Sequence, residues 1–230
     1  MPGCDLTEEL GNGGMGAVWR ASDTTLDRED LRKAVEAGAT MSTHLGNGAH
    51  HMIQRHNNYL WYQLACRQTY ASFISDGQHL PTECLYSMLH AKGLDRSIIT
   101  SDCVNLGGLK AGIYGDVEKT PAGRLNAIGT ANLAGSASNL RECTETVIRL
   151  GGVSHAEGWT LAALQPARML GLGRRLGMEP GREASITVYK YHARGPRIEV
   201  IETWVAGRKV FDARTMPRSV IPDAPVDMRE

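Results

Sequence analysis

The chain has 230 residues, of which 42% are hydrophobic and 22% are charged. This composition is typical of a globular protein with enough apolar mass for a sizeable core. Its 25 lysines and arginines balance 25 aspartates and glutamates. That balance argues against a protein that binds nucleic acid or an anionic membrane through excess positive charge.

Neither the N-terminus nor the cysteines suggest export from the cell. The first residues are acidic and lack the basic-then-apolar order of a signal peptide. No apolar run approaches the roughly 20 residues of a membrane span. The five cysteines are odd in number and form no CxxC pair, so we expect neither a disulfide scaffold nor a zinc ribbon. We therefore expect a cytoplasmic protein.

The N-terminal segment is glycine-rich, with the sequence GNGGMGAVWR at positions 11–20. A short strand is predicted over 17–21. The pattern then predicts a helix over 27–37, because an apolar stripe at helical spacing ends at a glycine. A short buried strand is predicted over 41–45.

The same order of helix and strand follows twice more. A helix predicted over 59–67 precedes a strand over 70–75, and a helix over 82–91 precedes a strand over 96–100. Helices and strands that alternate at intervals of roughly 25 residues are typical of βαβ units with a parallel sheet.

Polar side chains stand where these three strands should end. They are His44, then Asp76 with His79, and then Asp102. Because the carboxyl ends of parallel strands carry the functional site in α/β folds, this placement predicts a site at that edge of the sheet.

The rest of the chain has a different pattern. Residues 109–129 are turn-rich, and helices are predicted over 139–150 and 156–170. Residues 184–189 and 198–204 alternate in hydropathy like antiparallel strands. The proline-containing and charged segment 214–230 is predicted to be a disordered tail.

The glycines at 11, 13 and 16, followed by Val18, fit the glycine loop of protein kinases. Such a loop lays backbone N–H groups over ATP phosphates. The surrounding sequence resembles bacterial Ser/Thr kinases from Leu10 to about Glu29. The strand lysine and the HRD and DFG motifs of a kinase are absent, so a kinase-like nucleotide binder is a remote alternative.

Four motifs occur in order along the chain: THLGNG at 43–48, SDGQHLP at 75–81, TSD at 100–102 and LAGS at 133–136. Together they resemble the amidohydrolase superfamily and, within it, the N-acetylglucosamine-6-phosphate deacetylases. The resemblance covers about residues 30–211 and corresponds to the C-terminal half of such an enzyme.

The resemblance implies an α/β fold built from part of a TIM-type barrel. Residues 27–180 would form the later strands and helices of a (β/α)8 barrel, and residues 181–213 the C-terminal strands of a small β-sandwich. Residues 1–26 would be a kinase-like glycine-rich segment ahead of them.

The resemblance also implies a role for individual residues. Asp102 would be the catalytic general base and acid, which activates a metal-bound water and later protonates the leaving amine. His44 would bind a divalent metal of the zinc or iron type. The implied substrate-binding residues are Asn47, Gly48, Arg55, His79, Leu133, Ala134, Gly135 and Ser136.

The sequence departs from the family at the metal site. The family's metal-binding glutamate belongs to its N-terminal half, which these motifs do not cover. Asp23 stands where the family has its other metal histidine, so we expect Asp23 and His44 as the metal ligands. The strand at 17–21 would then take the place of the fifth barrel strand. Residues 46–49 replace the family's aromatic-Asn-Ala-Met run, so phosphate could instead be held by glycine-loop amides.

These observations predict a metal-dependent amidohydrolase that removes an N-acetyl group from an amino sugar phosphate. Two alternatives stay open: an inactive truncated remnant, and a half-enzyme that needs a partner chain. We expect a homo-oligomer or pairing with a complementary half-barrel chain, because an open sheet leaves strand edges unpaired. We also expect Ile74, Ile98 and Ile99 to be only partly shielded, which would favour self-association. We expect no nucleic-acid or membrane partner.

Overall fold

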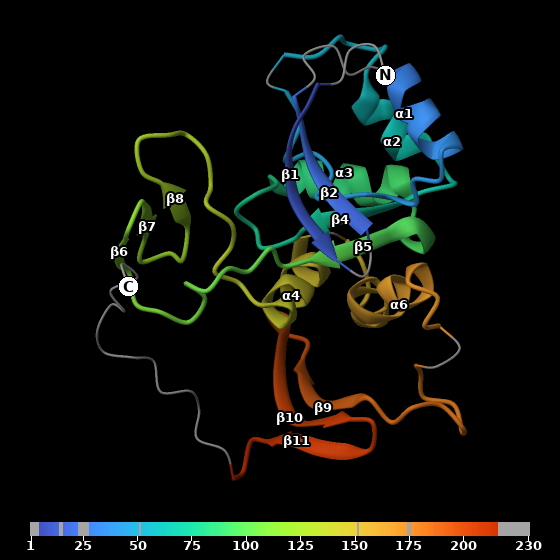
Figure 1. Cartoon of the computed structure of the whole chain (residues 1–230). Coiled ribbons are helices and arrows are strands. Elements are labelled where there is room, and N and C mark those ends of the chain that lie inside the picture. The colour runs from blue at the N-terminus through green and yellow to red at the C-terminus, as the bar shows by residue number, and fades with distance from the viewer. Residues whose placement is uncertain are drawn as a thin grey trace.

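The computed structural model describes residues 5–13, 16–22, 28–50, 52–150, 152–173 and 176–215, the first two ranges by their backbone alone. The described strands form four separate sheets, and helices flank the central one (Figure 1). In the described part of the chain, no helix is long and apolar enough to span a membrane.

The central sheet contains three parallel strands in the order β3-β4-β5. They are β3 (Met41–Ser42), β4 (Tyr70–Ile74) and β5 (Ser97–Thr100). The parallel βαβ arrangement predicted from the alternating pattern is therefore confirmed. The first strand is shorter than the predicted 41–45, because the chain turns at His44, where φ is 31°.

A helix precedes each strand of this sheet. They are α1 (Arg28–Glu36), α2 (Tyr59–Ala65) and α3 (Thr82–Lys92), with a short 3₁₀ turn, η1 (Leu94–Arg96), before β5. Asn58 caps α2, since its side-chain oxygen accepts a hydrogen bond from the Trp61 amide at 3.1 Å. Proline before α3 and glycine after it set the ends of that helix.

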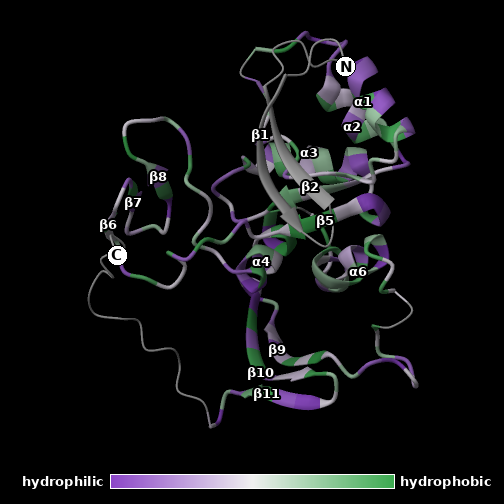
Figure 2. Cartoon of the chain, viewed as in Figure 1, coloured by the Kyte–Doolittle hydropathy of each residue, from purple (hydrophilic) through white to green (hydrophobic). Residues whose placement is uncertain are grey.

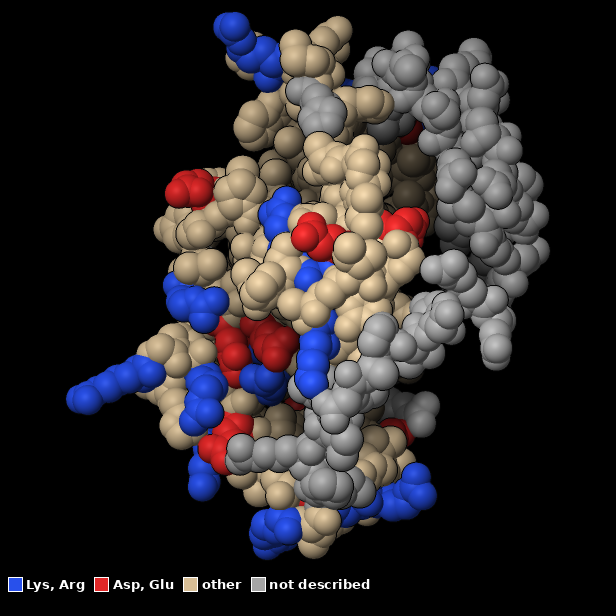
Figure 3. Space-filling view, turned by 90° about the vertical axis from the view of Figure 1, so that its left-hand side faces the viewer, with Lys and Arg blue, Asp and Glu red and all other residues tan. Residues whose placement is uncertain are grey.

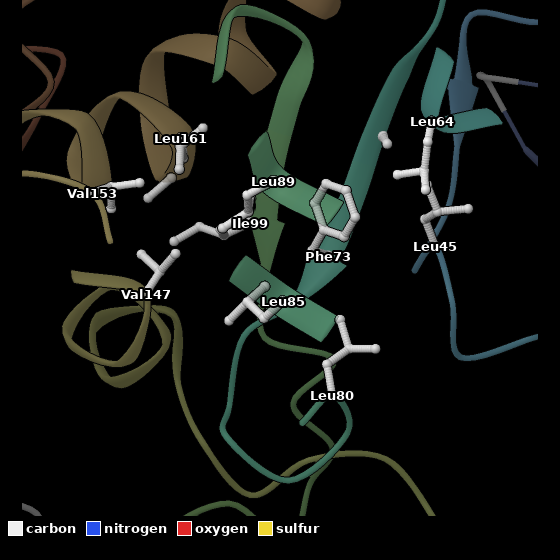
Figure 4. Packing of buried hydrophobic residues seen from close by; sticks show 12 residues of the cluster. Leu45, Leu64, Phe73, Leu80, Leu85, Leu89, Ile99, Val147, Val153 and Leu161 are labelled. Carbon is white, nitrogen blue, oxygen red and sulfur yellow. The ribbon is translucent and has the colours of Figure 1, made fainter. Parts of the chain in front are cut away.

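The core lies on one face of the central sheet (Figure 4). Phe73 on β4 and Ile99 on β5 point into it, and Leu85 and Leu89 of α3 pack against them. Complete burial of one such side chain contributes roughly 1.5–3 kcal/mol to the free energy of unfolding. In Figure 2 the labelled strand β5 carries hydrophobic colouring, in keeping with its place beside this core.

A fully buried lysine fastens α3 to the end of α2. The Lys92 Nζ donates hydrogen bonds to the carbonyl oxygens of Gln63 and Cys66, at 2.7 and 2.6 Å, and to Thr69 Oγ1 at 3.3 Å. These carbonyls at and just after the end of α2 would otherwise lack partners. Burial lowers the pKa of this ammonium group to about 8.

A long helical segment covers the β5 side of the sheet. After α4 (Leu140–Leu150) come α5 (His155–Trp159), one π-helical turn, η2 (Thr160–Leu164), and α6 (Gln165–Met169). Both η2 and α6 contact β5. The helices predicted over 139–150 and 156–170 are confirmed.

Because these helices cover the β5 side of the sheet, one expectation about the isoleucines of β4 and β5 is wrong. Ile74, Ile98 and Ile99 are only 2%, 6% and 2% exposed, so they are not partly shielded as we expected. Ile99 belongs to the core, and Ile98 on the opposite face lies beside α6 in a small cavity that Pro166 also lines. Exposure of these three side chains therefore cannot drive self-association.

Residues 112–127 form a small antiparallel sheet where the sequence indicated only turns. Its strands are β6 (Gly112–Tyr114), β7 (Val117–Lys119) and β8 (Leu125–Ala127). Three residues are too few for an alternating pattern to stand out in a sequence.

On the face of the molecule that Figure 3 shows, acidic and basic side chains are interspersed, in agreement with the zero formal net charge.

The C-terminal strands form another antiparallel sheet, in the order β11-β10-β9. They are β9 (Ile186–His192), β10 (Arg197–Val205) and β11 (Arg208–Asp212). The predicted strands over 184–189 and 198–204 are confirmed. Glu145 of α4 joins this sheet to the helices, because its carboxylate accepts a hydrogen bond from the Ile198 amide at 2.5 Å.

The N-terminal strands pair with each other and not with the central sheet. The strand predicted over 17–21 is present as β2 (Gly16–Ser22), and its partner is the antiparallel strand β1 (Asp5–Gly13). The expectation that it would take the place of the fifth barrel strand is wrong. A hairpin forms from segments adjacent in sequence and so needs only a short loop to close. Asp23, and the tail beyond residue 215, lie outside the described residues.

Candidate functional site

The carboxyl ends of the three parallel strands open into one cavity of about 570 Å³. Its lining combines the loops after β3, β4 and β5 with the segment around β8. The lining residues are His44, Asn47, Ile74, Gln78, His79, Asp102, Arg124, Ala131, Asn132, Leu133 and Gly135.

Six of the eleven residues that the sequence singled out line this cavity, four do not, and one lies outside the described residues. Gly48 lies beside the His44 ring but lines a neighbouring cavity. Ala134 and Ser136 belong to the loop that lines the cavity without lining it themselves. Arg55 is exposed and is not among the lining residues. Asp23 is not described.

Ser72 of β4 holds the loop that carries His44. The His44 amide donates to Ser72 Oγ at 2.8 Å, and the Leu45 amide donates to the Ser72 carbonyl oxygen, also at 2.8 Å. The positive φ of His44 is an uncommon conformation for a residue other than glycine. These two hydrogen bonds help to offset its cost and leave the His44 side chain exposed at the cavity.

Asp76 organises the turn after β4. Its carboxylate, 1% exposed, accepts hydrogen bonds from the amides of Gln78 and His79 at 2.9 and 3.0 Å and from His79 Nδ1 at 2.8 Å. Burial by itself would raise the pKa of Asp76. The hydrogen bonds from His79 and Gln78, with one from Ser136, outweigh burial and lower that pKa to about 2.

His79 stands between two carboxylates. Its ring is 9% exposed, and its Nε2 lies 3.8 Å from Oδ2 of Asp102, opposite the contact with Asp76. The Asp102 side chain is 48% exposed and faces the cavity. An imidazole and a partly exposed carboxylate side by side in a cavity can exchange a proton with a bound molecule.

The loop 133–136 is attached to the end of β5. The Ser136 amide donates to the Asp102 carbonyl oxygen at 2.9 Å, and the Val104 amide donates to the Ser136 carbonyl oxygen at 3.0 Å. Gly135, with φ of 90°, lets this loop approach closely. A Cβ there would lie 2.6 Å from a methyl group of Val104.

Asn47 brings an unsatisfied donor to the cavity wall. Its side-chain nitrogen is buried and has no hydrogen-bond partner among the residues that the structure describes. Leaving such a group unpaired costs about 1–3 kcal/mol, so a ligand that offers an acceptor at this position would recover that cost. Among the observations at the site, this one points most directly to a bound molecule.

Sequence reasoning missed several lining residues, including Gln78, Arg124 and Asn132. Arg124 is exposed, and its Nε donates to the Asn126 side chain at 3.0 Å. It places a positive charge at the cavity from a segment that the sequence marked only as turns. Nothing in the local pattern indicated that β8 would fold back over the strand ends.

The described residues do not form a metal site by themselves. Among them, no three His, Cys, Asp or Glu side chains are grouped as a metal ion would require. Of the two expected ligands, the structure describes only His44.

The chain resembles N-acetylglucosamine-6-phosphate deacetylases. It is 28% identical over 195 residues to the N-acetylglucosamine-6-phosphate deacetylase of Vibrio furnissii, a match that covers 84% of this chain and 47% of the relative. It is 27% identical over 184 residues to the N-acetylgalactosamine-6-phosphate deacetylase of Escherichia coli O157:H7. That match covers 78% of this chain and 47% of the relative. No known family profile matches. The resemblance inferred from the four motifs is confirmed, and the chain spans about half the length of these two relatives.

Solved structures show the same fold. The N-acetyl-D-glucosamine-6-phosphate deacetylase of Mycobacterium smegmatis matches with a TM-score of 0.71 at 23% identity, over 80% of this chain and 49% of that one. The N-acetylglucosamine-6-phosphate deacetylase of Thermotoga maritima matches with a TM-score of 0.71 at 22% identity. That match covers 82% of this chain and 51% of the other. A mutant of the Mycobacterium enzyme in complex with N-acetyl-D-glucosamine-6-phosphate matches with a TM-score of 0.69 at 22% identity. That match covers 80% of this chain and 48% of the other. The predicted α/β fold class is confirmed.

The contact between Gly135 and Val104 yields a stability prediction. We expect Gly135→Ala to lower the free energy of unfolding in urea by about 1–3 kcal/mol, because it adds both a strained φ and a clash. Gly129→Ala is the matched control, since Gly129 has φ of 80° but open space around its Cβ position. Equal losses in the two variants would contradict the assigned clash.

Proposed function

We propose that this chain carries part of the active site of a metal-dependent amidohydrolase that hydrolyses the N-acetyl group of an amino sugar phosphate. The observation that carries this proposal is the gathering of His44, His79 and Asp102 around one cavity. Asn47 also lines it, and its side-chain nitrogen has no hydrogen-bond partner in the described part of the chain. The similarity to the deacetylases supports the reaction class.

Asp102 is the group suited to proton transfer in this reaction. Water adds to the acetyl carbonyl and gives up a proton to the carboxylate, and the C–N bond then breaks as the nitrogen takes a proton. The products are acetate and the free amine. Asp102 is exposed enough to reach a bound amide, and its contact with His79 keeps it beside a second proton-carrying group.

The other lining residues suit a polar, anionic substrate. In this proposal the Asn47 amide contacts the sugar phosphate, His79 contacts the substrate, and the loop 133–136 forms one side of the pocket. Arg124 supplies the positive charge for phosphate, since it lines the cavity and Arg55 does not. Relatives named for N-acetylglucosamine and for N-acetylgalactosamine phosphates both support an amino sugar phosphate as the substrate class.

The metal fits the described residues only in part. A catalytic zinc ion takes three protein ligands and one water, whereas the described residues offer His44 without a ligand group around it. We propose that His44 contributes one ligand to a divalent ion of the zinc or iron type. The other ligands would come from residues outside the described ones, Asp23 among them, or from another chain. We assign no reaction step to the ion.

We further propose that β3, β4 and β5 belong to a (β/α)8 barrel that a second copy or a complementary chain completes. Their parallel order and the preceding helices support this. β3 has one strand partner within the described part of the chain, and its Met41 is 37% exposed. Beside it lies an apolar cavity of about 360 Å³, lined in part by Leu31 and Val35 of α1. In the same arrangement β9–β11 would be strands of the small β-sandwich.

The proton-transfer role predicts the effect of removing one carboxylate. Asp102→Asn should lower the release of free amine from N-acetylglucosamine 6-phosphate by about 10²-fold or more, because an amide cannot shuttle the proton. Asparagine tolerates the positive φ of 52° at this position, so the fold should be kept. Asp116→Asn, an exposed change between β6 and β7, is the control. Near-normal turnover by Asp102→Asn would remove Asp102 from the role. No turnover by the native chain, with or without added metal, would favour the inactive or half-enzyme alternative.

Metal content follows from the small ligand set. After dialysis we expect the purified chain to hold well below one equivalent of zinc or iron, measured by elemental analysis. His90→Ala, on α3 away from the cavity, serves as the control for changes at His44. Stoichiometric metal that is lost in His44→Ala and kept in His90→Ala would contradict this prediction.

The open edge at β3 predicts association. Light scattering should give masses above the 25.0 kDa of one chain, and Met41→Lys should reduce them, because a charge on an edge strand opposes pairing. Met52→Lys, at a loop position that is 90% exposed, should leave them unchanged. A sharp monomer peak with a cooperative melt would be incompatible with the proposed assembly.

A further inference from the structure

Asp76 has no part in the hydrolysis described above, yet it is the carboxylate at the site most fully enclosed by hydrogen bonds. Its side chain is 1% exposed and accepts hydrogen bonds from three donors: two backbone amides and the His79 ring. A buried charge is retained at such a position only when it is well paired.

The geometry constrains which atom of His79 can carry the proton. Oδ1 of Asp76 is occupied by the amides of Gln78 and His79, and Oδ2 lies 2.8 Å from His79 Nδ1. An ionised carboxylate only accepts hydrogen bonds. The short contact therefore requires a hydrogen on Nδ1.

The other ring nitrogen faces the reacting groups. His79 Nε2 lies 3.8 Å from Asp102 Oδ2, and both residues line the cavity. Because the hydrogen bond of one ring nitrogen decides the state of the other, a proton fixed on Nδ1 leaves Nε2 free to accept or to carry the exchangeable proton.

We propose that Asp76 is a positioning residue: it fixes a proton on His79 Nδ1 and so presents Nε2 to the substrate and to Asp102. The part of this inference that concerns the substrate rests on the proposed function. The part that concerns the ring does not, because it follows from the contacts of His79 alone.

A purely structural role for Asp76 makes a different prediction. The turn after β4 needs an acceptor for the Gln78 and His79 amides, and Asp76→Asn keeps one in its side-chain oxygen. The amide nitrogen of the variant would then face His79 Nδ1 as a donor. Nδ1 would have to accept, and the neutral ring would carry its proton on Nε2, as happens when a triad aspartate is replaced by asparagine. The variant should therefore move the ring proton from Nδ1 to Nε2 and still provide the acceptor that the turn needs.

The experiment is long-range ¹H–¹⁵N correlation spectroscopy of the full chain with ¹⁵N-labelled histidine, at about pH 8, where an ordinary histidine is neutral. We expect His79 to carry its proton on Nδ1 in the native protein and on Nε2 in Asp76→Asn. The internal reference is His90, whose Nδ1 bonds the Tyr86 carbonyl oxygen at 2.8 Å. Asp95→Asn, which alters an exposed carboxylate paired with Arg67, should leave His79 unchanged.

Two results would overturn the inference: a native His79 protonated on Nε2 alone, or Asp76→Asn with the proton still on Nδ1. If Asp76→Asn does not fold, the native spectrum still decides, because it reports the proton on Nδ1 directly. Under the proposed function, Asp76→Asn should also lower kcat/KM by about 10–100-fold, as loss of an orienting partner does elsewhere. If the His79 proton moves to Nε2 in Asp76→Asn and kcat/KM stays unchanged, His79 has no part in that function. The role of Asp76 in fixing the proton on His79 would still hold.

Discussion

The parallel alignment of β3, β4 and β5 is the constraint on which the candidate site depends. Because the three strands run in one direction, the chain leaves each of them at the same edge of the sheet, and residues far apart in sequence meet there. The turn that follows β3 is held against β4 by two hydrogen bonds to Ser72, and these bring His44 to that edge. Had the strands been antiparallel, His44 and His79 would lie at opposite ends of the sheet.

Backbone strain is concentrated where the strands end. In the described part of the chain, three residues other than glycine have positive φ, and two of them are His44 and Asp102. Such conformations cost of order 1–3 kcal/mol and persist only where surrounding contacts hold them. Here those contacts are hydrogen bonds from neighbouring strands and loops, so stability of the sheet and placement of the two side chains depend on the same interactions.

Sequence patterns were sufficient for the parts of the fold that repeat. Every α-helix and strand of the βαβ region was predicted, with ends within a few residues, because apolar periodicity and flanking glycines mark them. The ends of β4 and β5 placed Asp76, His79 and Asp102 correctly at one edge. The order of the four motifs was enough to indicate the family that the chain resembles.

Patterns failed where a contact joins segments that are distant in sequence. Nothing local showed that α6 would cover Ile98, or that β2 would pair with β1 and not join the central sheet. The strands β6–β8 escaped notice because three residues show no period, and Arg124 was missed along with them. Arg55 was implied by the family resemblance, at the spacing of a phosphate-binding arginine, whereas in the structure it is exposed and does not line the cavity.

The cavity is bounded by two walls of different construction. Strand ends that share the main hydrophobic core supply His44, His79 and Asp102, whereas the small sheet β6–β8 supplies Arg124. Backbone hydrogen bonds such as that from the Ala134 amide to the Leu125 carbonyl oxygen link the small sheet to the loop 133–136. No residue of β6–β8 belongs to the main core cluster beneath the strand ends. Under the proposed function, the wall that brings Arg124 to the phosphate and the groups suited to proton transfer therefore rest on different packing.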